Sequence, residues 1–174
     1  MLTRTNIATV AILILAMSPA LMAQGTVRIG VFDSRAVAIA YGQSAAFGTE
    51  MKQLMADFQK AKEEKNEKLV AELESKGQTQ QKLLHLQGFS IGSVSEILAK
   101  YDDALKAVAK EVNVAAMVSQ YELLYQGSGV ETVDLTEALV KKINDSPRVI
   151  GMLGEIKKNK PLPMIEVLGM KDEH

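Results

Sequence analysis

One short segment of the chain has the residue types and spacing of a catalytic turn, the run Gly88-Phe89-Ser90-Ile91-Gly92. It matches the pattern G-x-S-x-G, in which a sharp turn between a strand and a helix exposes the oxygen of a serine that attacks an ester or amide carbonyl. Such a serine needs a histidine as base and an acid that orients the histidine. A serine hydrolase with Ser90 as its nucleophile is therefore one candidate function.

The histidines that Ser90 would need are poorly placed in the sequence. In the usual chain order of that hydrolase fold the acid and the histidine follow the serine, and only His174, the last residue, does so here. His85 precedes the serine, and the alternating strands and helices of a large parallel sheet are missing from the pattern. We interpret the segment as a Gly-flanked hinge. The hydrolase stays an alternative, which covalent capture of Ser90 by a serine-directed probe would establish.

Other groups that could hold a metal or a cofactor are isolated. His85 lies among leucines with no second histidine, cysteine or paired carboxylate at ligand spacing, which disfavours a metal site. The turn Gly127-Ser128-Gly129 lacks the Lys-Ser/Thr pair of a phosphate-binding loop. We expect no catalytic residue, no metal and no cofactor.

The composition disfavours several classes of protein. Basic and acidic residues nearly balance, 20 against 21, and no basic stripe with interleaved aromatic residues is present, so we expect no nucleic-acid binding. Aromatic residues make up only 5% of the chain, and many alanines, leucines, methionines, lysines and glutamates favour extended helices. The chain has no cysteine, so stability must come from packing or oligomerisation rather than from disulfides.

The N-terminal residues 1–23 have the layout of a secretory signal peptide. Arg4 stands in a short polar start, an apolar run extends from Ile7 to Met17, and small residues follow. We expect export, with cleavage after Ala23 or, as second choice, after Ala20. An uncleaved anchor in the inner membrane is the alternative.

Two strand-like segments, residues 26–33 and residues 114–126, lie far apart in the chain. The second divides into a predicted β-hairpin around Gln120-Tyr121. Because an isolated strand leaves its N–H and C=O groups unpaired, we expect the three strands to form one sheet. The prediction is a single α+β domain over residues 24–145, with a small three-stranded sheet of antiparallel type.

The segment between the strands, residues 35–111, predicts a long helical hairpin that projects from the sheet. Its tip lies either at Gly77, a helix-ending residue, or at the Gly88–Gly92 break. After the strand pair, residues 134–144 predict a helix that lies on the sheet, with Asp134 as its cap. Residues 146–174 form a C-terminal extension.

One side of the predicted arm carries apolar residues at spacings of three and four, and charged residues cover the other side. Two methionines belong to this stripe, and methionine suits contact with varied partners because its side chain is flexible and polarisable. The stripe contains Met51, Leu54, Met55, Phe58, Leu69 and Leu73.

The order of these pieces resembles the OmpH/Skp family of periplasmic chaperones. The resemblance rests on the strand Ile29-Gly-Val-Phe-Asp33, the helical hairpin and the helix start Asp134-Leu-Thr-Glu-Ala-Leu-Val140, and it is strongest over residues 27–47 and 107–143. It implies a homotrimer in which the strands and end helices form a common body and three arms enclose a cavity. Members of the family hold unfolded outer-membrane proteins in that cavity without ATP.

The resemblance implies a periplasmic, ATP-independent holdase that binds unfolded outer-membrane or other exported proteins. Its client-binding residues would be the six of the arm stripe. Its assembly core would include Val27, Ile29, Val31, Leu135 and Leu139. The arms are shorter than in that family, and the net charge is −1 where the best-known members are basic, so we expect no strong lipid binding. The alternative is a non-catalytic envelope scaffold whose arms bind one folded partner.

Overall fold

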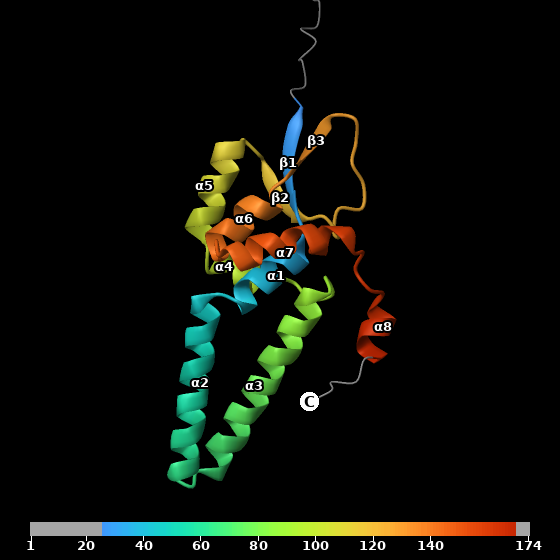
Figure 1. Cartoon of the computed structure of the whole chain (residues 1–174). Helices are drawn as coiled ribbons and strands as arrows, with labels where there is room; N and C mark the ends of the chain where they lie inside the picture. The colour runs from blue at the N-terminus through green and yellow to red at the C-terminus, as the bar shows by residue number, and fades with distance from the viewer. Residues whose placement is uncertain (1–25, 170–174) are drawn as a thin grey trace, which may run out of the picture.

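A computed structural model describes residues 26–169, so the predicted signal peptide and residues 170–174 lie outside the described part of the chain. Within it, the chain forms eight helices and a three-stranded sheet, and two of the eight helices project from the rest, the body, as an arm (Figure 1). The elements, in chain order, are β1 Val27–Phe32, α1 Ser34–Gly42, α2 Ala45–Glu63, α3 Glu67–Gly88, α4 Ser95–Ala99, α5 Asp102–Val112, β2 Ala116–Ser119, β3 Val130–Asp134, α6 Thr136–Ile143, α7 Pro147–Lys158 and α8 Met164–Gly169.

The three strands form a parallel sheet in the order β2-β1-β3. In the central strand, Ile29 is paired with Ala116 on one side and with Thr132 on the other. The predicted antiparallel-type sheet is therefore wrong. The hairpin predicted over residues 114–126 is wrong as well, because β2 ends at Ser119 and the chain then runs as an irregular loop to β3.

The path of the loop over residues 120–129 explains the parallel direction. The dipeptide Gln120-Tyr121 has neither the glycine nor the asparagine that a tight hairpin favours. Instead, the Gln120 amide donates to the carbonyl oxygen of Phe32 at 2.8 Å, which holds the chain at the carboxyl end of β1. The loop then passes to the opposite end of the sheet, where the Val27 amide donates to the Gly129 carbonyl oxygen at 3.0 Å. β3 consequently starts beside the start of β1 and runs the same way.

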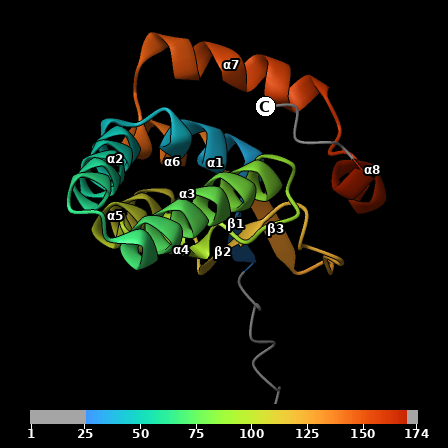
Figure 2. The same ribbon diagram turned by 90° about the horizontal axis from the view of Figure 1, so that it is seen from below.

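The core of the body lies where α1, α6 and α7 pack together and where α6 packs against β1. Leu135 and Leu139 lie at its centre, each 1% exposed. Gly30 allows Leu135 to approach β1, because a Cβ atom at Gly30 would lie 2.2 Å from Cδ1 of Leu135. Figure 2 shows α7 alongside α1 and α6, so this helix of the C-terminal extension packs on the body.

The arm consists of α2 and α3 alone, and its tip lies at residues 64–66. The two positions predicted for the tip are wrong: Gly77 lies inside α3, and the Gly88–Gly92 segment follows α3 at the body. With 19 residues in α2 and 22 in α3, the arm helices are about 28 and 33 Å long at a rise of 1.5 Å per residue. The rest of the predicted arm, residues 35–111, forms α1, α4 and α5 of the body.

The chain reverses at the tip without a glycine. Lys65 adopts a left-handed conformation with φ 52°, its amide donates to the Lys62 carbonyl oxygen at 3.1 Å, and the Asn66 amide donates to that of Ala61 at 2.9 Å. These two bonds form a Schellman motif, which ends α2. The Asn66 side chain then accepts a hydrogen bond from the Leu69 amide at 3.1 Å and caps α3.

The predicted helix over residues 134–144 is shorter at its start. Asp134 is the last residue of β3, and α6 begins at Thr136. The Asp134 carboxylate still accepts a hydrogen bond from the Thr136 amide at 2.9 Å, so it caps the first turn from within the strand.

Candidate functional site

A groove runs between the two helices of the arm. α2 and α3 meet at the tip and diverge toward the body (Figure 1). The groove encloses about 640 Å³ and is open to solvent. Its apolar lining consists of Phe47, Met51, Leu54, Met55, Phe58, Leu73 and Leu84.

The structure brings five of the six residues of the predicted arm stripe together in this groove. Met51, Leu54, Met55 and Phe58 line it from α2, and Leu73 lines it from α3. Met55 is 59% exposed, which is high for a methionine on the inner side of a helix pair. The sixth, Leu69, lies half-buried in the first turn of α3 and is not part of the lining.

Sequence reasoning missed the part of the groove nearest the body. Phe47, Gly77 and Leu84 line it there, but interpreting Gly77 as a helix end cut the apolar pattern of α3 short. The signal was present, because Leu73, Gly77 and Leu84 follow one another at helical spacings of four and seven. A Cβ atom at Gly77 would lie 3.6 Å from Cδ2 of Leu54, so the glycine keeps this wall of the groove flat.

Three polar side chains, those of Glu74, Gln81 and His85, also line the groove. The His85 ring packs edge-on against Phe89, with ring centroids 5.0 Å apart. Within residues 26–169, no group of three or more side chains of the metal-binding types comes together. A groove with apolar walls, flexible methionines and few polar anchors can hold apolar side chains of varied shape.

A polar cluster fixes the base of the arm to the body. The Tyr41 hydroxyl donates to Oε2 of Glu50 at 2.7 Å, and Nζ of Lys100 donates to Oε1 of Glu50 at 2.6 Å and to the Tyr41 hydroxyl. The hydrogen bonds from Lys100 and Tyr41 lower the pKa of Glu50. Because Tyr41 lies in α1, Glu50 in α2 and Lys100 after α4, the cluster sets the angle at which α2 leaves the body.

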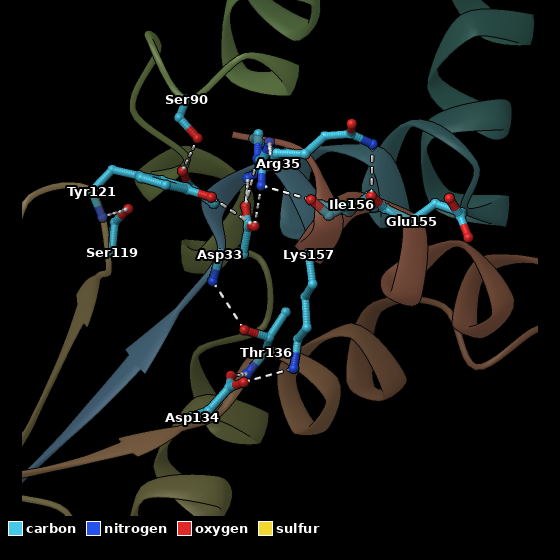
Figure 3. A network of polar contacts seen from close by, with 12 residues as sticks. Asp33, Arg35, Ser90, Ser119, Tyr121, Asp134, Thr136, Glu155, Ile156 and Lys157 are labelled. Atoms are coloured by element: carbon cyan, nitrogen blue, oxygen red, sulfur yellow. Dashed lines mark hydrogen bonds and ion pairs between the residues drawn. The ribbon is translucent and has the colours of Figure 1, made fainter. Parts of the chain in front are cut away.

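A second polar cluster lies at the carboxyl end of β1 (Figure 3). The Asp33 carboxylate accepts from Nη2 of Arg35 at 2.7 Å and from the Tyr121 hydroxyl at 2.9 Å. Arg35 also donates to the carbonyl oxygens of Ile156 at 2.9 Å and Asn159 at 2.7 Å, at the end of α7. Burial raises the pKa of Tyr121, and the bond to Asp33 raises it further. These bonds join β1, α1, the loop after β2 and α7.

Ser90 terminates α3 in a left-handed conformation, with φ 63°. Its amide donates to the Gln87 carbonyl oxygen at 3.1 Å, and the Ile91 amide donates to that of Leu86 at 3.0 Å. This is again a Schellman motif, with a serine where glycine is usual. The predicted hinge is thus a helix end at the body.

The surroundings of Ser90 differ from those of a nucleophile turn. A nucleophile turn follows a strand, whereas the segment before Ser90 is the helix α3. Its Oγ lies 3.1 Å from Oγ of Ser34. His85, which precedes it in α3, lines the arm groove.

The structure divides the five predicted assembly residues into two groups. Leu135 and Leu139 belong to the core of the single chain. Val27 is 47% exposed, and Ile29 and Val31 are half-buried. Since side chains alternate along a strand, these three share the sheet face that points away from Leu135. Of the five predicted assembly residues, Val27, Ile29 and Val31 are therefore the ones that another chain could contact.

Comparison of the chain with protein-family models, with characterised proteins and with solved structures found no match in any of the three. None of the helices between residues 26 and 169 is long and apolar enough to cross a membrane. The groove between α2 and α3 is the largest of the described pockets, and its lining is the most apolar, so it is our candidate functional site.

Proposed function

We propose that this protein is an exported, ATP-independent holdase that binds apolar segments of unfolded envelope proteins, outer-membrane proteins among them, in the groove between α2 and α3. The single observation that carries the proposal is the groove itself, about 640 Å³ in volume and walled by aromatic, methionine and leucine side chains. Exposed apolar surface of this kind marks a binding site in a soluble protein.

The chemistry of the groove favours unfolded chains as its occupants. Fully burying one large apolar side chain stabilises a complex by about 1.5–3 kcal/mol, and burial in an open groove gives less. Unfolded chains expose many such side chains, whereas folded proteins bury them. The few polar groups of the lining impose little requirement on the sequence of the bound segment.

Weak binding in one groove becomes tight binding when several grooves act on one chain. We therefore include a homotrimer in the proposal, with the sheet face of Val27, Ile29 and Val31 at the contact between subunits and the arms around a shared space. Partial exposure of these three residues supports this arrangement. A periplasmic location belongs to the proposal, because a holdase of this kind acts on exported chains before they fold.

A scaffold that binds one folded partner is the second candidate. It is supported by the loop after β2, where Leu124 is 95% and Tyr125 84% exposed. Exposed aromatic and aliphatic side chains on a loop suit contact with the surface of a folded protein. The two candidates differ in the partner, so one experiment can separate them.

The test is suppression of aggregation. An unfolded outer-membrane β-barrel protein is diluted from denaturant without ATP, and light scattering is followed with and without the purified protein. We expect the protein to suppress scattering. Aggregation at the unassisted rate would rule out the holdase and leave the scaffold.

A pair of charge variants tests whether the groove is responsible. Met55→Asp with Phe58→Asp places two carboxylates in the groove lining. Thr49→Asp with Ala56→Asp adds the same charge at exposed positions of α2 outside the lining. We expect only the first pair to lose suppression, while circular dichroism shows both variants to be equally helical. Equal activity of the two variants would place client binding elsewhere.

A further inference from the structure

A second pocket lies at the carboxyl ends of β1 and β2 and shares no lining residue with the arm groove. It encloses about 310 Å³, which is at the lower end of the range for small-molecule sites. In open parallel sheets, ligands bind beyond the carboxyl ends of the strands. This pocket lies at that end of the sheet, because Phe32 is the last residue of β1, Ser119 is the last residue of β2, and both line it.

Hydroxyl groups converge on this pocket. Ser34 and Ser119, each 5% exposed, line it together with Ser90 and Tyr121. Ser34 and Ser90 share a single hydrogen bond of 3.1 Å, which leaves one hydroxyl proton of the pair and several lone pairs for a ligand. The Ser119 oxygen accepts from the Tyr121 amide at 3.3 Å and keeps its own proton to donate.

The buried ion pair beside the pocket holds these groups in place. Figure 3 shows Tyr121 pointing at Asp33, which accepts its hydroxyl proton at 2.9 Å. Arg35 stacks over the Tyr121 ring, 5.2 Å from its centroid, and is itself bonded to Asp33. A wall whose side chains are locked by a second layer of bonds is preorganised for binding.

The residue type at position 90 also points to the pocket. The left-handed position that ends a helix is usually glycine, because a side chain there costs about 1–2 kcal/mol. Gly88 and Gly92 flank the turn, yet neither has a positive φ, and Ser90 takes the left-handed position. A role for the Ser90 hydroxyl in the pocket would explain why this position is a serine, although glycine would make the fold more stable.

The charge of the lining restricts the ligand. Of the residues that line this pocket, Glu122 is the one acidic residue, and none is lysine, arginine or histidine. Arg35 lies close by, but its guanidinium is bonded to Asp33, Ile156 and Asn159. An anionic ligand would find no free cation among these residues. The apolar part of the wall includes Phe32, Leu98, Leu105 and Met117.

We propose that this pocket binds a neutral, hydroxyl-rich ring of monosaccharide size, either as a free sugar or as the end of a glycan. The ligand hydroxyls bond to Ser34, Ser90 and Ser119, and one face of the ring packs on the apolar wall. This site goes beyond the proposed holdase function and does not depend on it.

The test is a titration of the full-length, isotopically labelled protein followed by amide chemical shifts. The probes are D-glucose, its disaccharide maltose, D-galactose, N-acetyl-D-glucosamine and, as an anionic comparator, glucose 6-phosphate. We expect at least one neutral sugar to shift the amides of Ser34, Ser119 and residues 90–93 in a saturable way. Binding of glucose but not maltose would assign a free sugar, and binding of both would assign a glycan end. Shifts elsewhere only, no saturable shift with any neutral sugar, or tighter binding of glucose 6-phosphate would overturn the proposal.

Ser90→Gly is the decisive variant, because glycine suits the left-handed cap and the fold is retained. Loss of one hydroxyl partner should weaken sugar binding about fivefold. Lys65→Gly is the matched control: it makes the same change at the other left-handed cap, at the arm tip. Unchanged affinity in Ser90→Gly, or an equal loss in both variants, would remove Ser90 from the site and contradict the proposal.

Discussion

Arg35 and Asp33 form a buried ion pair in which Nη2 and Oδ2 lie 2.7 Å apart and the side chains are 8% and 1% exposed. Asp33 is also the cap of α1, since its Oδ1 accepts from the Arg35 amide at 3.0 Å. The pair stands where β1 passes into α1 and connects both to the end of α7. The Asp33 carboxylate thus caps α1 and also neutralises the charge of Arg35, the side chain that bonds to the end of α7.

Arg35→Met should destabilise the protein by about 3–5 kcal/mol, because removal of one partner leaves a buried carboxylate without its counter-ion. Tyr121→Phe removes one neutral donor from the same carboxylate and should cost about 1–2 kcal/mol. Urea denaturation followed by circular dichroism measures both. As a control, Lys60→Gln breaks the exposed pair with Glu64 and should change stability by less than about 0.5 kcal/mol. An Arg35→Met protein as stable as this control would show that the pair is not a structural anchor.

Acid should weaken the contact between β3 and α7. Burial alone raises the pKa of Asp134, but hydrogen bonds from Lys157 and Thr136 outweigh it and hold the pKa below its ordinary value of 3.8. A carboxyl group whose pKa is lowered by folding stabilises the fold above its unfolded pKa, and this stability is lost as the pH falls through the folded pKa. The hydrogen bond to Asp134 raises the pKa of Lys157, so alkali does not weaken the contact until the pH exceeds about 10.5.

The measurement is the urea midpoint of the wild type and of Asp134→Asn across the acid range. We expect the wild type to be the more stable protein at neutral pH and the difference to shrink as the pH falls below about 4. A difference that stays constant with pH would mean that the ionised form of Asp134 contributes nothing.

Lys65→Gly should stabilise the protein by about 1 kcal/mol. Lys65 has a φ of 52°, which is strained for a residue with a side chain and relaxed for glycine. Thermal unfolding checks the prediction, with Lys68→Gly as control. That residue lies in the first turn of α3, where glycine should destabilise the helix by up to about 1 kcal/mol. A lower melting temperature for Lys65→Gly would contradict the described tip.

Two glycine-to-alanine variants should have opposite effects. Gly77→Ala should stabilise α3 by about 0.5–1 kcal/mol, because the added Cβ meets only Cδ2 of Leu54 at an ordinary 3.6 Å. Gly30→Ala should cost about 1–3 kcal/mol, because its Cβ would lie 2.2 Å from Cδ1 of the buried Leu135. Denaturant titration of both variants measures the difference. Destabilisation by Gly77→Ala would mean that α2 and α3 pack more closely than described.

Local patterns predicted much of the groove but not the architecture around it. Met51, Leu54, Met55 and Phe58 lie at helical spacings, and a stripe of that kind needs no knowledge of the rest of the fold. Strand direction is different, because it depends on the path of the connecting loop. The segment after Ser119 has a strand-like composition, although Gln120-Tyr121 is a poor hairpin turn. Its hydrogen bonds to the end of β1 set the direction of the chain, and the sequence does not show them.

The arm tip was mispredicted because tertiary contacts outweigh local propensity. Gly77 has a low helix propensity, yet it lies opposite Leu54 in the middle of α3, where helix packing compensates for that propensity. The true tip uses Lys65 and Asn66, and only the asparagine is a conventional signal, as a helix cap. Buried networks such as that of Arg35 also escape sequence reasoning, because their partners are distant in the chain.

Photo-crosslinking from the groove tests directly whether unfolded chains bind there. Benzoylphenylalanine replaces Met55, which lines the groove, or Gln53, an exposed residue of α2 outside the lining. Each protein is irradiated with an unfolded outer-membrane β-barrel protein and, separately, with the same protein after folding. We expect crosslinks from position 55 to the unfolded protein, few from position 53, and none to the folded protein. Equal yields at both positions, or crosslinks to the folded protein alone, would contradict a groove that binds unfolded chains.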